Sequence, residues 1–441
     1  MDLCDFIIEH ENDDLSSLVL HRDRWPGIDV ALAAECISAR RKLRYKVSEW
    51  YADPAIICPL ALSAEQCSST ATAAYKAAVV RGAVRSATAT HEARSKNFRA
   101  QHPWPRRDNP DGDIRIADLT GGLGVDCWQF SKVASAVLYN EMNPPLFEAA
   151  QTNLPRLGCG NVGFSNICIS PSTLPGLLDA FRPDLVFADP ARRSGGRKVF
   201  LPEDCSPDIL ALQDMILDRG CRLLVKLSPM ADISLMLRKF HNVKELHIVE
   251  ADGECKELLL LMEPDFNGEC TLVVGNAGRS VPPDSTGDIR FTLGEEKAAE
   301  PAFISRDPEP GRLLFEPGPA LSKSGAFNLI SARFGLEKLG KDAHLYCGSP
   351  LSVDSATSGA LAPFGKFYEI LETAPFGNQS IRDFATLWPG ADVTARALPI
   401  NSKALQEKLK SGSKKKQNSD SQIHIFGVGT FIGRLLIAAS R

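Results

Sequence analysis

Apolar positions recur at two different spacings along the chain, and the change between them divides it. From residue 29 to residue 80 they recur every three or four residues, through 29–51 and again through 63–80. That spacing places apolar side chains on one face of a helix, so the sequence predicts a helical region over residues 1–80. Residues 81–113 are rich in Arg, Pro and Asp and lack a sustained period. We expect a basic insertion or linker there.

Seven short apolar runs follow between residues 114 and 263, most of them separated by helix-length segments. They are IRIADL, AVLYNE, VGFSNIC, DLVFAD, CRLLVKL, ELHIVE and ELLLLME. Strands that alternate with helices predict a parallel, doubly wound α/β sheet. Only ADGECK separates the last two runs, which predicts an antiparallel hairpin at the sheet edge. Seven strands ending this way favour the Rossmann-like sheet of a Class I methyltransferase over a plain dinucleotide-binding sheet.

Two smaller regions complete the chain. Residues 264–340 hold strand-like pieces among many glycines and prolines, and we expect a small β-rich domain there. Residues 341–441 then alternate as strand, helix, strand, helix, strand, strand, which predicts a second compact α+β domain. Within it, residues 403–416 carry six lysines against one glutamate. This lysine tract is either a solvated loop or a face that contacts phosphates.

Composition excludes several classes of protein. Hydrophobic residues at 44% and charged residues at 24% exclude a largely disordered or collagen-like chain. The acidic start and the lack of a long apolar run predict a cytoplasmic protein without a membrane segment. The twelve cysteines include no C-x-x-C pair, so we expect no metal site or disulfide framework. A net charge of -4 argues against a surface that is basic throughout, but it is compatible with a local basic patch.

The first motif with a chemical implication is IADLTGGLGVD at residues 116–126. Here an apolar strand ends at Asp118 and runs into Gly121, Gly122 and Gly124. Glycines allow a tight turn and let the backbone approach a ligand at the carboxyl end of a strand, although such turns also serve packing. The spacing is not G-x-G-x-x-G and no G-K-[ST] follows, which disfavours NAD and ATP. The Asp118 carboxylate can instead accept a hydrogen bond from the amino group of S-adenosylmethionine.

Glu141 ends the next run, 23 positions after Asp118. An acidic side chain at this place in a nucleotide-binding sheet accepts hydrogen bonds from the two ribose hydroxyls of adenosine. The alternative is that Glu141 caps the helix that NPPLFEAAQTNL predicts. Together with the glycine turn, Glu141 favours the ribose contact.

The third motif is DLVFADPARRSGGRK at residues 184–198, where a strand delivers Asp189 and Pro190 to the same sheet edge. These two residues begin the tetrad DPAR at 189–192. An Asp-Pro tetrad of this kind suits methylation of an amine, which attacks a sulfonium methyl group through its nitrogen lone pair. The Asp189 carboxylate and the carbonyl oxygens of Pro190 and Ala191 can accept the amine hydrogens and orient that lone pair. The alternative is an ordinary turn capped by Asp189. The position of the tetrad, three strands after the glycine turn, favours catalysis.

Positive charges follow this predicted acceptor site. Arg192 ends the tetrad, Arg193 follows it, and Arg197 and Lys198 come next. They either hold substrate phosphates or neutralise nearby acidic side chains. Lys226 ends the fifth run and is either a substrate contact or part of a structural ion pair.

These motifs together resemble a bacterial family of predicted S-adenosylmethionine-dependent methyltransferases with a THUMP-like domain at the C-terminus. The resemblance rests on LSAEQCSSTATAAYKA at 62–77, IADLTGGLGVD, DPARR with the trailing GRKVFLPEDCSPD, VKLSPMADI at 225–233 and GKFYEILETAPF at 365–376. It implies a methyltransferase domain over 114–263, a ferredoxin-like domain over 264–340 and a THUMP-like domain over 341–441. THUMP domains bind RNA, so the resemblance also implies an RNA substrate. Carried over residue by residue, it assigns the cofactor loop to Asp118, Gly121, Gly122 and Gly124, the ribose contact to Glu141, and catalysis to Asp189 and Pro190.

The chain departs from the family after the third run, where Cys168 stands in the neighbourhood of an acidic residue that often recognises adenine. We expect methylation of an exocyclic or ring amine of an RNA base, with S-adenosylmethionine as methyl donor. The alternatives are a catalytically silent RNA-binding protein on the same fold and a methyltransferase acting on a protein or small molecule. Methylation of a pyrimidine carbon is disfavoured, because it needs a cysteine nucleophile and ADPARRSG and VKLSPM contain none.

Overall fold

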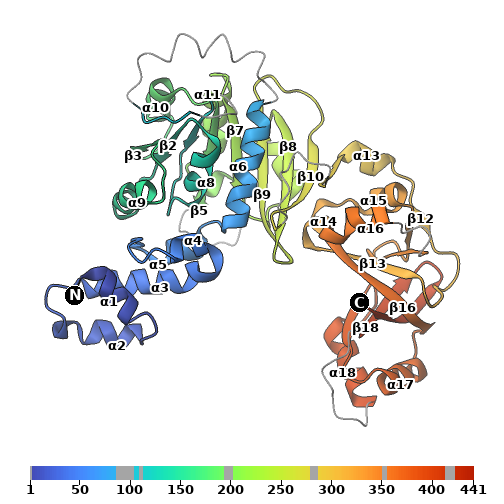
Figure 1. Ribbon diagram of the computed structural model, residues 1–441. Coiled ribbons are helices and arrows are strands. Elements are labelled where there is room, and N and C mark those ends of the chain that lie inside the picture. Colours follow the sequence, from blue (N-terminus) through green and yellow to red (C-terminus); the bar gives the residue numbers. More distant parts are fainter. Residues whose placement is uncertain are drawn as a thin grey trace. The chain divides into compact units, whose positions relative to one another are not determined.

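The structure is a computed structural model. It describes residues 2–85, 104–108, 113–192, 202–278, 287–349, 355–412 and 423–441. The chain forms two compact units. The first comprises residues 1–251, 256–270 and 277–286, and the second comprises residues 252–255, 271–276 and 287–441. In Figure 1 the first unit runs from blue to yellow-green and most of the second from yellow to red.

The N-terminal region is helical, as the spacing of its apolar residues predicts. Its α-helices are α1 (Leu3–Glu9), α2 (Leu15–Leu20), α3 (Val30–Lys46), α4 (Ser48–Tyr51), α5 (Ala61–Gln66) and α6 (Thr70–Arg85). Asp2, Asp14 and Asp29 cap the first three, since each carboxylate accepts a hydrogen bond from the backbone N–H three residues later. Helix α6 ends at Arg85, beyond the boundary predicted at residue 80.

Part of the predicted insertion at 81–113 therefore has regular or packed structure. Besides the last turn of α6, residues 104–108 lie against the sheet. The Trp104 ring meets Phe181 edge-on, with centroids 5.5 Å apart, and a Cβ on Gly163 would lie 2.3 Å from the same ring. The Arg107 backbone N–H donates to the Ser135 carbonyl at 3.0 Å. Residues 86–103 and 109–112 of the predicted insertion lie outside the described residues.

The sheet of the first unit contains the seven predicted strands. They are β1 (Arg115–Asp118), β2 (Ala136–Asn140), β3 (Val162–Ser165), β4 (Leu185–Ala188), β7 (Arg222–Leu227), β8 (Val243–Ala251) and β9 (Glu254–Met262). Their spatial order is β8-β9-β7-β4-β1-β2-β3. Strands β3, β2, β1, β4 and β7 run parallel. Strand β9 lies between β8 and β7 and is antiparallel to β7. Strands β8 and β9 are thus neighbours in the sheet, as the short ADGECK link predicts.

Helices connect and cover these strands. They are α8 (Val125–Val133), α9 (Pro144–Arg156), α10 (Leu174–Phe181), α11 (Ile209–Leu217) and α12 (Ile233–Lys239). From β1 the chain proceeds to β2 and β3 on one side, whereas β4 and β7 lie on the other. The carboxyl ends of β1 and β4 thus mark the topological switch point, where open α/β sheets bind their ligands.

The N-terminal helices share a hydrophobic core with this sheet. Helix α6 packs against α8 and β8 (Figure 1). Trp50 of α4 meets Trp128 of α8 edge-on, with ring centroids 6.1 Å apart, and both rings are buried. The end of α3 and helices α4 to α6 therefore form a layer of the first unit, whereas α1, α2 and the start of α3 pack around a hydrophobic cluster of their own.

The second unit is built around a continuous sheet. Strands β10 (Thr271–Asn276) and β11 (Ile289–Thr292) form an antiparallel pair. The described residues of the larger sheet form strands β12 (Ala302–Phe303), β13 (Leu313–Pro317), β14 (Glu337–Lys338), β15 (Tyr346–Gly348), β16 (Gly365–Pro375), β17 (Asp392–Arg396), β18 (Ile423–Thr430) and β19 (Gly433–Ser440), in the order β12-β14-β15-β13-β16-β19-β18-β17. Strand β13 pairs with both β15 and β16. The sheet thus crosses the boundary predicted between residues 340 and 341.

Some of the helices of the second unit were predicted from the sequence and others were not. Helices α17 (Asn378–Leu387) and α18 (Ser402–Gly412) complete the expected alternation of strand and helix. The region 264–340, expected to be β-rich, also contains α13 (Leu293–Ala298), α14 (Pro319–Ser324) and α15 (Phe327–Phe334), and α16 (Ser355–Leu361) follows it. Gly325 and Gly335 end α14 and α15 with φ of +78° and +62°. These two glycines thus end their helices in the left-handed conformation.

Two absences can be stated for the described part of the chain. Its helices include none long and apolar enough to cross a membrane. Its His, Cys, Asp and Glu side chains form no group of three that could hold a metal ion. None of the twelve cysteines, all of which lie among the described residues, is in a disulfide bond, and six of them are buried.

Candidate active site

Three predicted acidic residues meet at the switch point of the first sheet. Asp118 is the last residue of β1, while Glu141 and Asp189 directly follow β2 and β4. Backbone donors link these strand ends. The Gly122 N–H donates to Glu141 Oε2 at 2.8 Å, and the Asp189 N–H donates to Thr120 Oγ1 at 2.7 Å. The structure therefore brings the three acidic residues to one edge.

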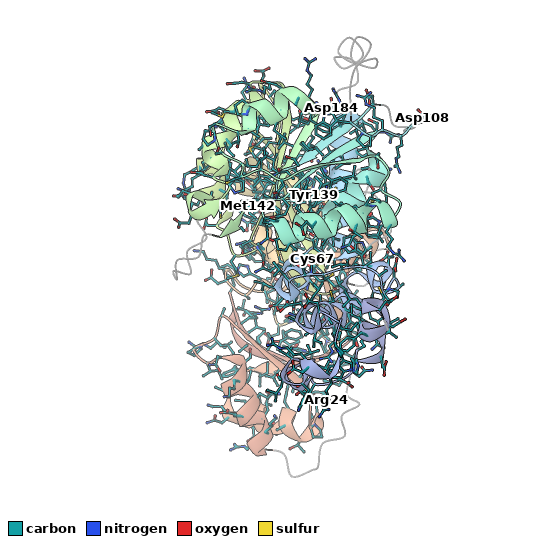
Figure 2. All side chains as sticks on the ribbon, turned by 90° about the vertical axis from the view of Figure 1, so that its left-hand side faces the viewer. Arg24, Cys67, Asp108, Tyr139, Met142 and Asp184 are labelled. Atoms are coloured by element: carbon teal, nitrogen blue, oxygen red, sulfur yellow. The ribbon has the colours of Figure 1, made fainter. Side chains whose placement is uncertain are left out.

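Strand β2 explains why the turn after β1 is made of glycines. A Cβ on Gly121 would lie 2.2 Å from the Tyr139 ring. Gly122 and Gly124 have φ of +54° and +99°, which an L side chain rarely adopts. The Tyr139 hydroxyl donates to the Gly122 carbonyl at 2.6 Å. Tyr139 is fully buried, whereas Met142, which is labelled with it in Figure 2, is exposed.

Asp118 has an incompletely satisfied carboxylate. The side chain is 1% exposed. Its Oδ1 accepts from the Thr120 N–H at 3.1 Å, but its Oδ2 has no hydrogen-bond partner among the described residues. Burial, with Asp126, Asp189 and Glu141 nearby, raises the pKa of Asp118 well above its usual range. A buried polar atom without a partner is costly, so this oxygen fits the amino group of a cationic ligand such as S-adenosylmethionine.

Glu141 does not cap helix α9. That role belongs to Asn143, whose side chain accepts from the Leu146 N–H. Glu141 instead spans two turns, since Oε1 accepts from the Asn143 N–H and Oε2 from the Gly122 N–H, both at 2.8 Å. The carboxylate thus lies against the glycine turn, where the ribose contact is predicted.

Asp189 and Lys226 form an ion pair. The Lys226 Nζ lies 2.5 Å from Asp189 Oδ2, across the parallel strands β4 and β7. Burial alone lowers the pKa of Lys226, but the charges of Asp189, Glu257 and Asp126 raise it above its usual value. Of the two roles predicted for Lys226, the described contacts show the ion pair. The pair engages Oδ2 and leaves Oδ1 of Asp189 for an acceptor.

The rest of the tetrad leads into a small ladder. Strand β5 (Ala191–Arg192) pairs antiparallel with β6 (Cys205–Ser206), with Ala191 opposite Ser206. Pro190 is half-buried and Ala191 is exposed. The ladder joins DPAR to the CSP segment. Arg193, Arg197, Lys198 and the side chain of Arg192 lie outside the described residues, as do Lys414, Lys415 and Lys416.

Asn140 holds the segment that follows β3. Its Nδ2 donates to the Ile167 carbonyl at 3.1 Å, and its Oδ1 accepts from the Ile167 N–H at 3.2 Å. Cys168, next along the chain, is exposed. Asn140 was not among the predicted site residues, although its place before Glu141 at the end of an apolar run marks it as a strand-end polar group.

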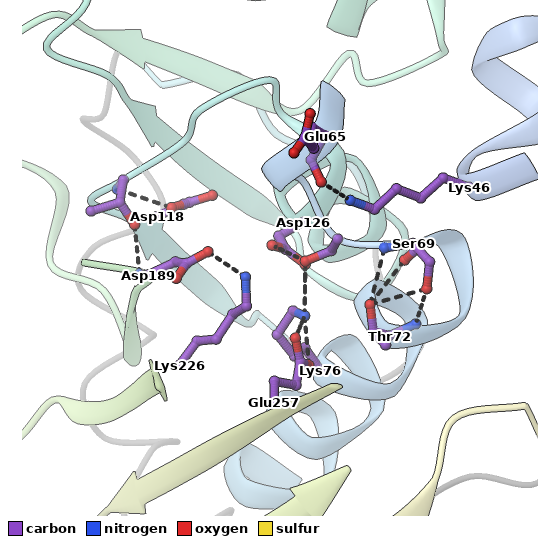
Figure 3. A network of polar contacts seen from close by, with 12 residues as sticks. Lys46, Glu65, Ser69, Thr72, Lys76, Asp118, Asp126, Asp189, Lys226 and Glu257 are labelled. Atoms are coloured by element: carbon purple, nitrogen blue, oxygen red, sulfur yellow. Dashed lines mark hydrogen bonds and ion pairs between the residues drawn. The ribbon is translucent and has the colours of Figure 1, made fainter. Parts of the chain in front are cut away.

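A buried ion network behind the strand ends was also missed (Figure 3). Lys76 of α6 is 0% exposed and lies between Asp126 of α8 and Glu257 of β9. The available signal was a lysine inside the apolar stretch AAYKAAVV. The predicted helix accounts for that stretch, but not for a charge on its buried face.

The chain is similar to several known proteins. Over residues 313–354 the chain matches a family model described as a ferredoxin-like domain. Two Mycobacterium tuberculosis proteins, from strains CDC 1551 and H37Rv, are named uncharacterized S-adenosylmethionine-dependent methyltransferases. Each is 24% identical over 298 residues, which cover 67% of this chain and 73% of the relative.

One solved structure is similar over the whole chain. It is the crystal structure of a candidate methyltransferase from Porphyromonas gingivalis W83, with 25% identity and a TM-score of 0.75, covering 100% of this chain and 97% of that one. The predicted Rossmann-like methyltransferase fold is thus confirmed. The relatives and the strand-end site together support the conclusion that this chain is a methyltransferase with S-adenosylmethionine as its cofactor.

Proposed function

We propose that this chain methylates an exocyclic or ring amine of an RNA base. The observation that carries the proposal is the pairing of two carboxylates at adjacent strand ends. Asp118 presents a buried oxygen without a described partner, and Asp189 follows the neighbouring strand. One suits the cationic methyl donor and the other suits the amine that receives the methyl group.

The cofactor half of the site consists of Asp118, the glycine turn and Glu141. Asp118 Oδ2 would accept from the amino group of the donor, and Glu141 would accept from the ribose hydroxyls. Gly121, Gly122 and Gly124 keep side chains away from the turn, so the backbone can approach the ligand. When bound, S-adenosylmethionine supplies a sulfonium methyl group.

The acceptor half orients the attacking nitrogen. Asp189 Oδ1 and the carbonyl oxygens of Pro190 and Ala191 would accept the amine hydrogens and direct the lone pair at the methyl carbon. A nitrogen–carbon bond would form as the sulfur–carbon bond breaks, which would leave a neutral thioether, and the methylated nitrogen would then lose one proton to water. Lys226 fixes Oδ2 of Asp189 by an ion pair, so that Oδ1 faces no competing partner from Lys226 and can accept hydrogen bonds during the attack.

An RNA acceptor is favoured by the positive charges that follow the tetrad. Arg192 ends the tetrad and Arg193 follows it in the sequence. Arginine side chains bind the phosphates of nucleic acids. In this proposal residues 341–441 act as a THUMP-like domain that holds RNA, and residues 264–340 as the ferredoxin-like domain. A protein or small-molecule acceptor would not require these arginines, whereas RNA binding without catalysis would leave the cofactor half without a role.

Calorimetry and nucleoside mass spectrometry test this proposal in two steps. The purified chain should bind S-adenosylmethionine and its demethylated product in preference to NAD. Absence of binding by either sulfur nucleoside at millimolar concentration would contradict the cofactor assignment. A strain lacking the gene should then lose one methylated nucleoside from total RNA, restored by the wild-type gene and not by Asp189→Ala. Unchanged nucleosides in the deletion strain would contradict RNA as the acceptor.

A further inference from the structure

Lys76 lies at the centre of a buried polar network between α6, α8 and β9 (Figure 3). Its Nζ donates to Glu257 Oε1 and Oε2 at 2.8 and 2.9 Å and to Ser68 Oγ at 3.0 Å. It also lies 3.2 Å from Asp126 Oδ1. Ser68 in turn donates to Asp126 Oδ2 at 2.8 Å. A fully buried ammonium is costly unless it is paired, and here two carboxylates and a hydroxyl satisfy it.

Glu257 is bonded by Lys76 and is also subject to the charge of Lys226. It is 2% exposed, and it precedes Leu258, which pairs with Leu227 of β7 next to Lys226. Burial raises the pKa of Glu257, while the charges of Lys76 and Lys226 oppose that rise. Both lysines therefore act on the same buried carboxylate. Lys76 holds its two oxygens, and Lys226 bonds Asp189 instead.

We propose that Lys76 is a positioning residue that keeps Lys226 on Asp189 by occupying Glu257. Without the Lys76 charge, Glu257 would be an uncompensated buried carboxylate close to the Lys226 ammonium. Lys226 would then turn from Asp189 to Glu257, and Asp189 would lose the partner that fixes its Oδ2. The effect on turnover rests on the proposed function, whereas the effect on the position of Lys226 does not.

The same network explains why loss of the Lys76 charge should change cofactor binding less than it changes turnover. Asp126 stands in the first turn of α8, directly after the glycine turn. It keeps the hydrogen bond from Ser68 when Lys76 is neutral. Loss of the Lys76 charge should therefore affect the acceptor half more than the cofactor half. A general loss of folded structure would weaken both halves together.

Crystal structures and kinetics of the full-length chain test the proposal with three variants. Lys76→Met should move Lys226 Nζ from Asp189 to Glu257. Turnover should fall by about 10²-fold, as for a misplaced catalytic group, with a much smaller change in S-adenosylmethionine affinity by calorimetry. Lys76→Met/Glu257→Gln removes both charges, so Lys226 should return to Asp189 and most of the turnover should return. Lys42→Met, which breaks an exposed pair with Glu65, is the matched control and should change neither quantity.

Two results would overturn the proposal. One is a Lys76→Met structure in which Lys226 stays on Asp189. The other is a double variant that folds but turns over no better than Lys76→Met. If Lys76→Met alone does not fold, a folded double variant with turnover about 10²-fold below wild type overturns the proposal instead. The acceptor in these assays is total RNA from cells lacking the gene. If wild-type protein transfers no methyl group to it, the proposed RNA substrate fails, and the position of Lys226 still decides the role of Lys76.

Discussion

The two halves of the candidate site lie on adjacent strands but are stabilised in opposite ways. In the cofactor half the carboxylates meet backbone N–H groups. Thr120 donates to Asp118, and Gly122 donates to Glu141. In the acceptor half the Asp189 carboxylate meets a lysine ammonium. The cofactor half thus has negative charge without a described cation, whereas the acceptor half already contains one.

This difference fits the charges of the proposed ligands. A methyl donor with a sulfonium and an ammonium group brings positive charge to Asp118, whose pKa burial and neighbouring acidic residues raise. A neutral amine brings no charge to Asp189, whose described charged partner is the Lys226 ammonium. One sheet edge can therefore hold a cation and orient a neutral nucleophile at the same time.

Removal of Asp189 should have the largest effect and should be confined to the acceptor half. We expect Asp189→Ala to lower turnover by about 10²–10³-fold, or ~2.7–4 kcal/mol, if its interaction is made chiefly in the transition state. Calorimetric affinity for S-adenosylmethionine should change far less, because Asp118 and Glu141 are retained. Asp179→Ala, which removes an exposed carboxylate on α10, is the control. Wild-type turnover in Asp189→Ala would refute the assignment.

A methyl group on the glycine turn should damage the cofactor half. In Gly121→Ala the new Cβ collides with the buried Tyr139 ring, and such overpacking costs about 1–3 kcal/mol. We expect a lower denaturant midpoint and weaker S-adenosylmethionine binding. Gly160→Ala has no atom within 4 Å of its Cβ and should behave as wild type in both measurements. Equal cofactor affinity in the two variants would show that the turn does not approach the ligand.

The pH dependence of cofactor binding should come from Asp118. Its pKa is raised in the folded, ligand-free chain, so at low pH the carboxyl is protonated and binds a cation poorly. Affinity for S-adenosylmethionine should rise with pH up to that raised pKa, by at most about tenfold per unit for one proton. Asp118→Asn should bind weakly with little pH dependence, whereas Asp179→Asn should keep the wild-type profile. A wild-type pH profile in Asp118→Asn would contradict this origin.

The same group makes a stability prediction with the opposite sign. Between the ordinary aspartate pKa of 3.8 and the raised folded value, the folded chain binds more protons at Asp118 than the unfolded chain. The free energy of unfolding contributed by this group therefore falls as pH rises through that window. Asp118→Asn should lack this fall in chemical denaturation without cofactor. An identical fall in the variant would assign it to other groups.

The sequence predicted the features that depend on neighbours along the chain. Strand ends, glycine turns and their order in a doubly wound sheet follow from local pattern and connection rules. This is why Asp118, Glu141 and Asp189 were found. The confirmed sheet and the proximity of these three acidic residues follow from that information alone.

The features that were missed depend on contacts between distant residues. Lys76 and Glu257 are 181 positions apart, and neither local pattern signals the other. The steric requirement at Gly121 comes from Tyr139 on the next strand. The region 264–340 was expected to be β-rich, but two of its glycines end helices, a distinction that depends on the packing of α14 and α15.

The smallest predicted effect concerns whether the last three lysines of the lysine tract bind the phosphates of the RNA. If Lys414, Lys415 and Lys416 each contact a phosphate, replacing all three by alanine should make the salt dependence of RNA binding shallower. The slope of log affinity against log salt should change by about 2, since each contact to single-stranded RNA contributes about 0.7. Fluorescence anisotropy with a single-stranded RNA oligonucleotide at several salt concentrations measures this slope. The control replaces Lys403, Lys408 and Lys410, the lysines of the tract that are exposed on α18. A slope that changes only in the control would place the RNA contact on α18 instead of on the three lysines at 414–416.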